Sequence, residues 1–144
     1  MPIPDTLLLA VCAFADDLPP ERVAQAIAKG VRAGGMPEPD LCPIEDCAGG
    51  TVAASLDALG FDARMRRARA VVLGAGRLDR ETLAGSAAFE IATRARQAGV
   101  PAYAVTGVDE LDAFDARMLD LQVILQASGV RGLSAAGRRL ARLA

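Results

Sequence analysis

Two glycines, an arginine and an aspartate follow a β-branched apolar stretch in the segment VVLGAGRLDRETLAGSAA, residues 71–88. A strand that leads through glycines into a helix is a common phosphate-binding arrangement, because the first helical N–H groups are free to donate to an anion. Arg77 adds a cation that can hold a carboxylate or a phosphate through two parallel hydrogen bonds. The pattern predicts a small anionic ligand bound beside Gly74, Gly76, Arg77 and Asp79.

The same residues also fit a purely structural interpretation. The glycines can serve only to turn the strand sharply into a helix, and Asp79 can cap that helix with Thr82 close behind it. Arg77 can form a local ion pair on the surface. The sequence alone leaves both interpretations open.

Two other phosphate-dependent classes are disfavoured. Asp79 occupies the place of the third glycine in a dinucleotide fingerprint, which leaves only a lone G-x-G. A receiver domain of phosphorelay signalling would suit the pair Asp16-Asp17 and Thr106, but its third strand should end in a phospho-accepting aspartate and here ends in Gly74. The stretch LQVILQASG (121–129) also lacks the lysine expected after the fifth strand.

The composition excludes several kinds of chemistry. The chain has no histidine, so a mechanism that needs a histidine base or a catalytic triad is excluded. Cys42 and Cys47 lack further cysteine or histidine partners and make a poor zinc site, and we assign no metal ligands. We expect Cys12 to be buried at the end of a central strand and Cys47 to lie in a loop, with all three cysteines in a reducing cytoplasm.

The 144 residues fit one domain, with 52% apolar and 24% charged residues and a formal net charge of −2. This balance gives no sign of a nucleic-acid or membrane partner. The N-terminal stretch TLLLAVCAFA lacks a preceding basic region and is too short to span a bilayer. We expect a buried strand there rather than a signal peptide, and a cytoplasmic protein.

Short apolar runs alternate with longer helical patterns, which is typical of βαβ units and a parallel sheet. We expect strands at 6–12, 69–74, 101–107 and 121–127, with a further short edge strand in the Pro-rich stretch 36–45. Helices are expected at 19–34, 49–60, 78–99 (interrupted near Gly85), 111–119 and 134–144, with a further turn or two after Gly60. The fold class is α/β: a single three-layer αβα sandwich of about five parallel strands, flavodoxin-like or Rossmann-like, over residues 1–144.

Ligands of such sheets lie beyond the carboxyl ends of the strands, where the strand order reverses. This rule selects four loops. They are 13–17, 45–51, 75–79 and 107–110.

Three stretches of the chain resemble the glycerate kinase family of bacterial sugar-acid kinases. AVCAFADDLPP (10–20) aligns with a family pattern like APDSFKGSLSA, PIEDCAGGT (43–51) with PLADGGEGT, and LGAGRLDRETLAGSAA (73–88) with TGEGRLDAQTLHGKAP. An LGFD segment at 59–62 precedes the third block, as it does in the family. The chain lacks the large segment that the family inserts before LGFD, which includes a domain that helps to close the active-site cleft.

The family's site residues carry over only in part. The resemblance implies catalytic roles for Asp46 and Asp79. It implies substrate or nucleotide binding by Gly50, Thr51, Gly74, Gly76, Arg77 and Thr82. Five positions depart from the family pattern: Cys12 and Ala75 replace acidic residues, Ala15 and Ser86 replace lysines, and Ala13 replaces a serine. Phosphoryl transfer depends on positioning and on neutralising the phosphate charge, so these substitutions remove much of what it requires.

The resemblance therefore implies a degenerate glycerate kinase, a pseudoenzyme that retains at most a weak anion or nucleotide site. ATP and Mg²⁺ are the cofactors implied, by resemblance alone. One alternative is an active small kinase that phosphorylates glycerate once a partner chain completes its site. Another is a structural or regulatory homodimer without a small ligand, which would cover apolar surface left by the missing domain.

Overall fold

The computed structural model describes residues 4–144, which form one five-stranded sheet of parallel strands in the order β2-β1-β3-β4-β5. The strands are β1 (Leu7–Val11), β2 (Asp40–Pro43), β3 (Ala70–Leu78), β4 (Ala102–Asp109) and β5 (Ile124–Gln126). The chain steps from β1 outward to β2 and then returns to the other side of β1 with β3. The order therefore reverses between β1 and β3, and the expected α/β sandwich is confirmed.

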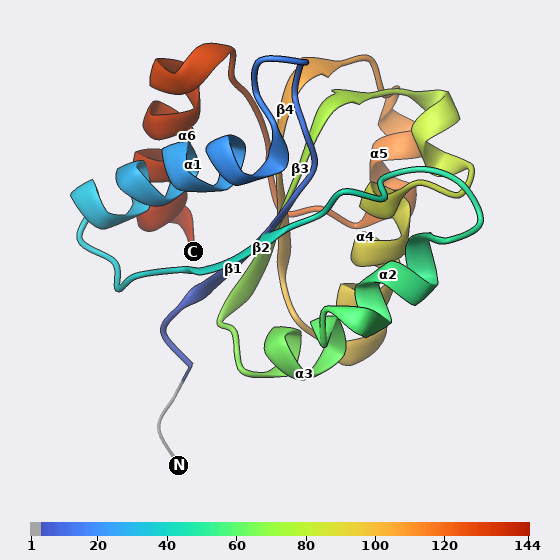
Figure 1. The fold of residues 1–144 in the computed structure, drawn as a ribbon, viewed down its shortest axis with the longest axis horizontal. Coiled ribbons are helices and arrows are strands. Elements are labelled where there is room, and N and C mark those ends of the chain that lie inside the picture. The colour runs from blue at the N-terminus through green and yellow to red at the C-terminus, as the bar shows by residue number, and fades with distance from the viewer. Residues whose placement is uncertain (1–3) are drawn as a thin grey trace.

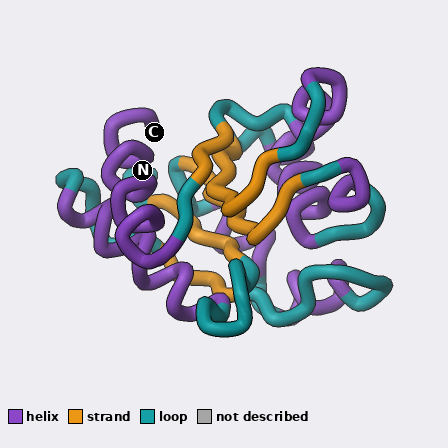
Figure 2. The backbone as a smooth tube through the Cα atoms, turned by 90° about the horizontal axis from the view of Figure 1, so that it is seen from above, coloured by secondary structure: helices purple, strands orange, loops and turns teal. Residues whose placement is uncertain are grey.

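Helices cover both faces of the sheet. Figures 1 and 2 show α1 and α6 on one side and the other helices on the opposite side, with the strands between them. The helices are α1 (Pro20–Ala33), α2 (Val52–Ala58), α3 (Phe61–Arg66), α4 (Ala87–Ala98), α5 (Ala113–Leu119) and α6 (Gly129–Leu143), with a 3₁₀ helix η1 (Arg80–Leu83) between β3 and α4. Within residues 4–144, no helix is long and apolar enough to cross a membrane.

The central strands are apolar on both faces because both faces are covered. All five residues of β1 are buried. Successive residues of the strand point alternately into two hydrophobic cores, one on each face of the sheet. Leu8 and Ala10 pack beneath α2–α5, whereas Leu7, Leu9 and Val11 pack beneath α1 and α6. The expected first strand at 6–12 is confirmed.

Ion pairs and close helix packing order the two outer layers. The Arg94 side chain of α4, only 13% exposed, reaches Asp57 and Asp62 near α2 and α3 and Glu90 on its own helix. On the opposite face, Gly30 of α1 lies directly against the Ser134 carbonyl of α6, where any side chain would clash. Because Gly30 has no side chain, α1 and α6 can pack closely at this point.

Two expected boundaries are wrong at the carboxyl edge of the sheet. β3 does not end at Gly74 but continues to Leu78, and β4 continues beside it to Asp109. The interruption expected near Gly85 in the helix over 78–99 is confirmed, because η1 precedes Gly85, α4 follows it, and the φ of Gly85 is +79°. The last helix begins at Gly129 rather than at residue 134.

Candidate functional site

The segments expected to meet at the carboxyl edge of the sheet do meet there. The Cys12 amide donates to the Gly74 carbonyl at 2.8 Å, which joins the end of β1 to β3. The loop after β2 reaches the start of α4, because the Ala87 amide donates to the Cys47 carbonyl at 2.9 Å and Ala48 pairs with Ser86. The structure thus brings the loop of residues 44–51 beside the segment that follows β3.

Gly74 and Gly76 lie within β3 rather than in a turn, so the predicted helix start after Gly76 is wrong. A Cβ on Gly76 would lie 2.7 Å from the Phe14 carbonyl oxygen, and a Cβ on Gly74 would lie 2.7 Å from a Val11 methyl group. The glycines therefore allow the chain after β1 to lie flat on β3. Neither glycine turns the strand into a helix, which corrects the structural interpretation of the G-x-G sequence as well, and the helix dipole expected directly after Gly76 does not lie at the predicted anion site.

Arg77 lies at the exposed edge of this region and is paired with acidic neighbours. Its Nη1 atom is 3.0 Å from Oε1 of Glu110, which follows β4, and 4.0 Å from Oδ2 of Asp79. The Arg77 side chain is 56% exposed, and the Glu110 side chain 53%. The guanidinium is within reach of a dissolved anion, but a carboxylate already holds it.

Asp79 serves as the cap of η1. Its Oδ1 accepts hydrogen bonds from the Thr82 amide and the Thr82 hydroxyl, each at 3.0 Å, and the Thr82 hydroxyl in turn accepts from the Asp79 amide at 2.5 Å. The side-chain and backbone hydrogen bonds from Thr82 hold the pKa of the Asp79 carboxyl below its usual value. The structural role expected of Asp79 and Thr82 is thereby confirmed, whereas their catalytic and binding roles stay predictions.

The other predicted residues lie in the loop after β2. Asp46 is exposed and accepts a hydrogen bond from the Ser55 hydroxyl at 2.5 Å. Gly50 and Thr51 are exposed as well, and Thr51 precedes α2 without a capping hydrogen bond from its side chain. Nothing in the structure assigns these three residues to a ligand.

A disulfide joins Cys12 to Cys47, which corrects the expectation of three thiols. Cys12 is 6% exposed at the end of β1, as expected, and Cys47 is partly buried in the loop after β2. Their positions after neighbouring strands are the sequence signal that could have suggested the bond. Cys42 remains a buried thiol, and burial raises its pKa above the usual range.

The carboxylates do not form a magnesium site of their own. Within residues 4–144, no group of three or more cysteine, aspartate or glutamate side chains gathers in a geometry that could hold a metal ion. Asp79 uses one oxygen to cap η1, and Glu110 pairs with Arg77. Mg²⁺ is usually held by one or two carboxylates together with water and substrate phosphates, so these residues do not form a complete Mg²⁺ site by themselves.

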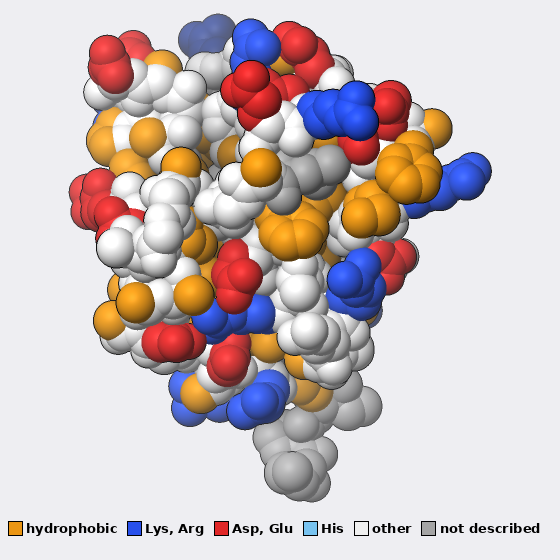
Figure 3. All heavy atoms as spheres, turned by 90° about the vertical axis from the view of Figure 1, so that its right-hand side faces the viewer, with side chains coloured by type: hydrophobic (Ala, Val, Ile, Leu, Met, Phe, Trp, Pro, Cys, Tyr) orange, Lys and Arg blue, Asp and Glu red, His pale blue; other side chains and the backbone are white. Residues whose placement is uncertain are grey.

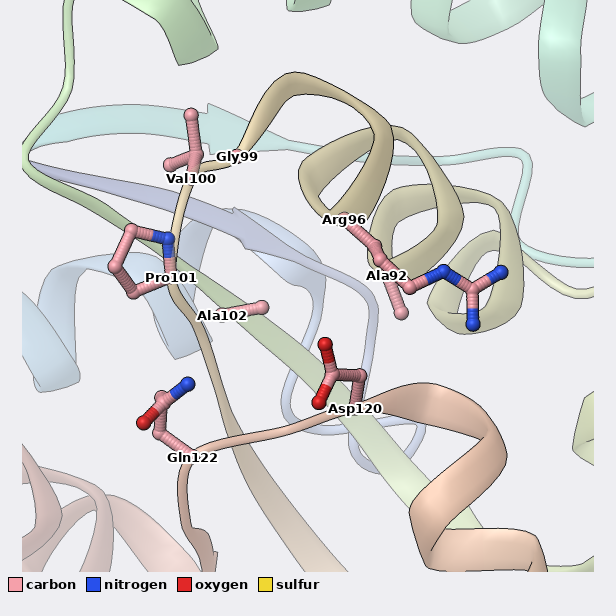
Figure 4. A pocket seen from close by; sticks show the side chains of 8 residues that line it. All are labelled: Ala92, Arg96, Gly99, Val100, Pro101, Ala102, Asp120 and Gln122. Carbon is pink, nitrogen blue, oxygen red and sulfur yellow. The ribbon is translucent and has the colours of Figure 1, made fainter.

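Surface hollows occur elsewhere on the molecule. One of about 220 Å³ lies at the opposite, amino end of β4, where Figure 4 shows Arg96 and Asp120 near Pro101 and Ala102. Another, of about 310 Å³, lies over α1 and α6 and is lined by Lys29, Val130, Arg131, Ser134 and Arg138. This second hollow is a competing surface for anions, because three of its five residues are cations and none is acidic.

A family model described as the glycerate kinase family matches residues 52–136, more than half of the chain. The LGFD segment and the block at 73–88 fall inside this match, whereas the two earlier blocks precede it. No curated protein sequence matches the chain significantly. Among solved structures, a protein described as glycerate kinase 2 from Salmonella typhimurium LT2 aligns with a TM-score of 0.48 and 18% identity. The alignment covers 63% of this chain and 26% of that protein's chain.

Proposed function

Because the chain belongs to the glycerate kinase family, we propose that it is a degenerate member that binds small anions weakly at Arg77 and does not transfer a phosphoryl group by itself. A kinase of this family would use ATP to phosphorylate the hydroxyl group of glycerate. Catalysis of that step requires cationic groups around the transferred phosphate.

The observation that carries the proposal is the engagement of the charged residues in contacts within the chain. Arg77 is held by Glu110 at 3.0 Å, and Asp79 is held by Thr82. Ala15 and Ser86 stand where the family pattern has lysines, and Ser86 caps α4 by accepting from the Phe89 amide at 3.1 Å. Arg77 is therefore the single cation among the predicted site residues, which is fewer than the stabilisation of a transferred phosphate requires.

Weak anion binding is compatible with this arrangement. Exposed ion pairs such as Arg77–Glu110 contribute only about 0–1 kcal/mol, so an anion can compete for the guanidinium. The nearby carboxylates of Asp79 and Glu110 oppose that competition. We expect millimolar rather than micromolar affinity for inorganic phosphate.

An assay of ADP release with ATP, Mg²⁺ and glycerate tests the catalytic part of the proposal. We expect no enzymatic turnover from the chain alone, whereas kinases turn over at roughly 1–100 s⁻¹. Turnover in that range would contradict the proposal if it disappeared in Asp79→Ala and survived in Asp112→Ala. Asp112 is a suitable control because it also caps a helix, accepting from the Asp115 amide at 2.8 Å, away from the predicted site.

A titration with inorganic phosphate, followed by NMR, tests the binding part. We expect chemical-shift changes at residues 74–79 and at Glu110. Changes confined to Lys29, Arg131 and Arg138 would place the anion over α1 and α6 and overturn the assignment to Arg77. Turnover that appears only when a second chain is added would instead favour the kinase completed by a partner.

A structural or regulatory homodimer without a small ligand is a second candidate function, and exposed apolar side chains of α5 favour it. Phe114 is 69% exposed and Met118 47% exposed, one helical turn apart. Figure 3 shows hydrophobic side chains among charged ones on the face of the molecule at the right of Figure 1. Sedimentation velocity over a range of concentrations measures whether the chain forms a dimer.

A further inference from the structure

We propose that the Cys12–Cys47 disulfide is a reversible redox site that clamps the loop of residues 44–51 and controls its mobility. A small dithiol, or a protein with a reactive dithiol, is the class of reactant that would open it. The effect of reducing the disulfide on anion binding rests on the proposed function. The clamp itself does not.

The crosslink joins the buried end of a strand to a partly exposed loop. Cys12 is 6% exposed and belongs to the core beneath α2–α5. Cys47 lies in the loop after β2, next to the exposed residues Asp46 and Ala48. Fixing one end in the core means that the bond restrains mainly the other end.

Other contacts also hold this loop, because the Ser55 hydroxyl donates to Oδ2 of Asp46 at 2.5 Å and Ala48 pairs with Ser86. Hydrogen bonds hold its beginning, where the Ile44 amide donates to the Val11 carbonyl at 2.9 Å, and its middle, where the Cys47 carbonyl accepts from the Ala87 amide. Beyond Ala48 the chain passes through exposed Gly49 and Gly50 to α2. Opening the disulfide would leave these hydrogen bonds as the principal restraint.

The fold does not need the crosslink to hold its core. β1 and β2 are already paired from Leu8↔Asp40 to Val11↔Pro43. A chain of 144 residues is also large enough to be stabilised by its hydrophobic cores without a disulfide. The bond therefore acts on the loop more than on the architecture, as expected of a regulatory crosslink.

The chemistry can begin at Cys47, which is the more exposed residue of the pair. A dithiol thiolate attacks Sγ of Cys47, the Cys47–Cys12 bond breaks, and Cys12 leaves as a thiolate that takes up a proton. The second thiol of the reagent then displaces Cys47 and becomes part of the reagent's own disulfide. The protein gains two electrons and two protons, and the reagent loses them.

The disulfide is also connected to the predicted anion site through the backbone of Cys12. Cys12 donates its amide to the Gly74 carbonyl, three residues before Arg77 on β3. Through this bond and the disulfide, the loop is linked to the strand that carries Arg77. We expect reduction to weaken phosphate binding by several-fold, because Gly50 and Thr51, the loop residues predicted to bind the ligand, lose their fixed position relative to β3.

The test compares the oxidised and dithiothreitol-reduced forms of the full chain. Alkylation under native conditions should label no cysteine of the oxidised chain and should label Cys47 after reduction, with Cys42→Ala removing any contribution from the third cysteine. Amide exchange of residues 44–51 should accelerate at least tenfold, while β3 and β4 keep their protection. Cys47→Ser should exchange like the reduced chain under both conditions.

The clamp would be overturned by a disulfide that dithiothreitol opens only after unfolding, or by unchanged loop exchange once the disulfide is open. Accelerated loop exchange without phosphate binding in either form would support the clamp and contradict the proposed anion site. Global unfolding on reduction would also overturn the proposal, because the crosslink would then be structural.

Discussion

The ion pair between Arg77 and Glu110 determines how far the guanidinium is available to an anion. Both side chains are more than half exposed, so their attraction is screened by water and salt. The pair is nonetheless the nearest competitor to any ligand, at 3.0 Å. Removing the Glu110 carboxylate should therefore leave the Arg77 guanidinium more available to an anion.

We predict that Glu110→Gln strengthens phosphate binding by up to about fivefold, since an exposed ion pair is worth about 0.2–1 kcal/mol. NMR titration with phosphate measures the change. Glu38→Gln is the matched control, because Glu38 pairs with exposed Arg32 at 2.8 Å outside the predicted site. Equal effects of the two variants would show that only the net charge matters.

The capping contact of Asp79 should be visible in its titration. Hydrogen bonds from Thr82 lower the pKa of Asp79 from its ordinary value of 3.8, so the ionised form is favoured in the folded chain. The stabilisation is complete above the unfolded-state pKa and is lost as the pH falls through the lower, folded-state pKa.

We predict that Thr82→Val raises the pKa of Asp79, as measured by carbon NMR of the carboxyl group between pH 2 and 6. Thr51→Val should leave that pKa unchanged, because the Thr51 side chain makes no capping hydrogen bond. A Thr82→Val chain with the wild-type titration would mean that another group holds the Asp79 carboxylate.

At the scale of elements, the extension of β3 to Leu78 makes Gly76 a packing position. The Phe14 backbone lies where a Cβ on Gly76 would be, so a larger residue must push the chain after β1 away from the sheet. The same chain segment carries Cys12. The packing at the carboxyl edge of the sheet and the disulfide therefore both depend on the position of the same segment, residues 12–14.

We predict that Gly76→Ala lowers the free energy of unfolding by about 1–3 kcal/mol, a typical cost of overpacking. Gly50→Ala should change it by less than about 0.5 kcal/mol, because nothing lies within 4 Å of a Cβ at that position. Urea denaturation measures both values. If Gly76→Ala left the free energy of unfolding unchanged, the segment around Phe14 would have to move away from the added methyl group at no cost.

The sequence was sufficient to predict the alternation of elements and the loops that meet at the carboxyl edge, because apolar runs such as LLLAV and VVL mark buried strands. It did not predict that β3 continues through Gly74 and Gly76. Glycine is a poor strand former on its own, and only the pairing with β4 and the backbone of Phe14 make it suitable here. The disulfide was missed for a similar reason, since pairing depends on which loops lie together in space.

At the scale of the whole molecule, the Cys12–Cys47 bond closes a loop of the unfolded chain that spans 35 positions. Closing such a loop restricts the unfolded ensemble, which by the chain-entropy estimate stabilises the folded state by about 4 kcal/mol. We predict that reduction lowers the free energy of unfolding by about 2–4 kcal/mol and leaves the chain folded. Urea denaturation with and without dithiothreitol measures the difference, and Cys47→Ser should show none.

The contact of Gly30 with Ser134 has a consequence for the order in which the molecule assembles. The two residues are about 100 positions apart in the chain, and α6 completes the cover over the core beneath α1. Contacts between such distant segments slow folding, because a long stretch of chain must be ordered before they form. Until α6 packs against α1, the apolar face of α1 that carries Val23, Ile27 and Val31 stays incompletely covered. Because α1 is synthesised long before α6, this face stays exposed until synthesis of the chain is nearly finished.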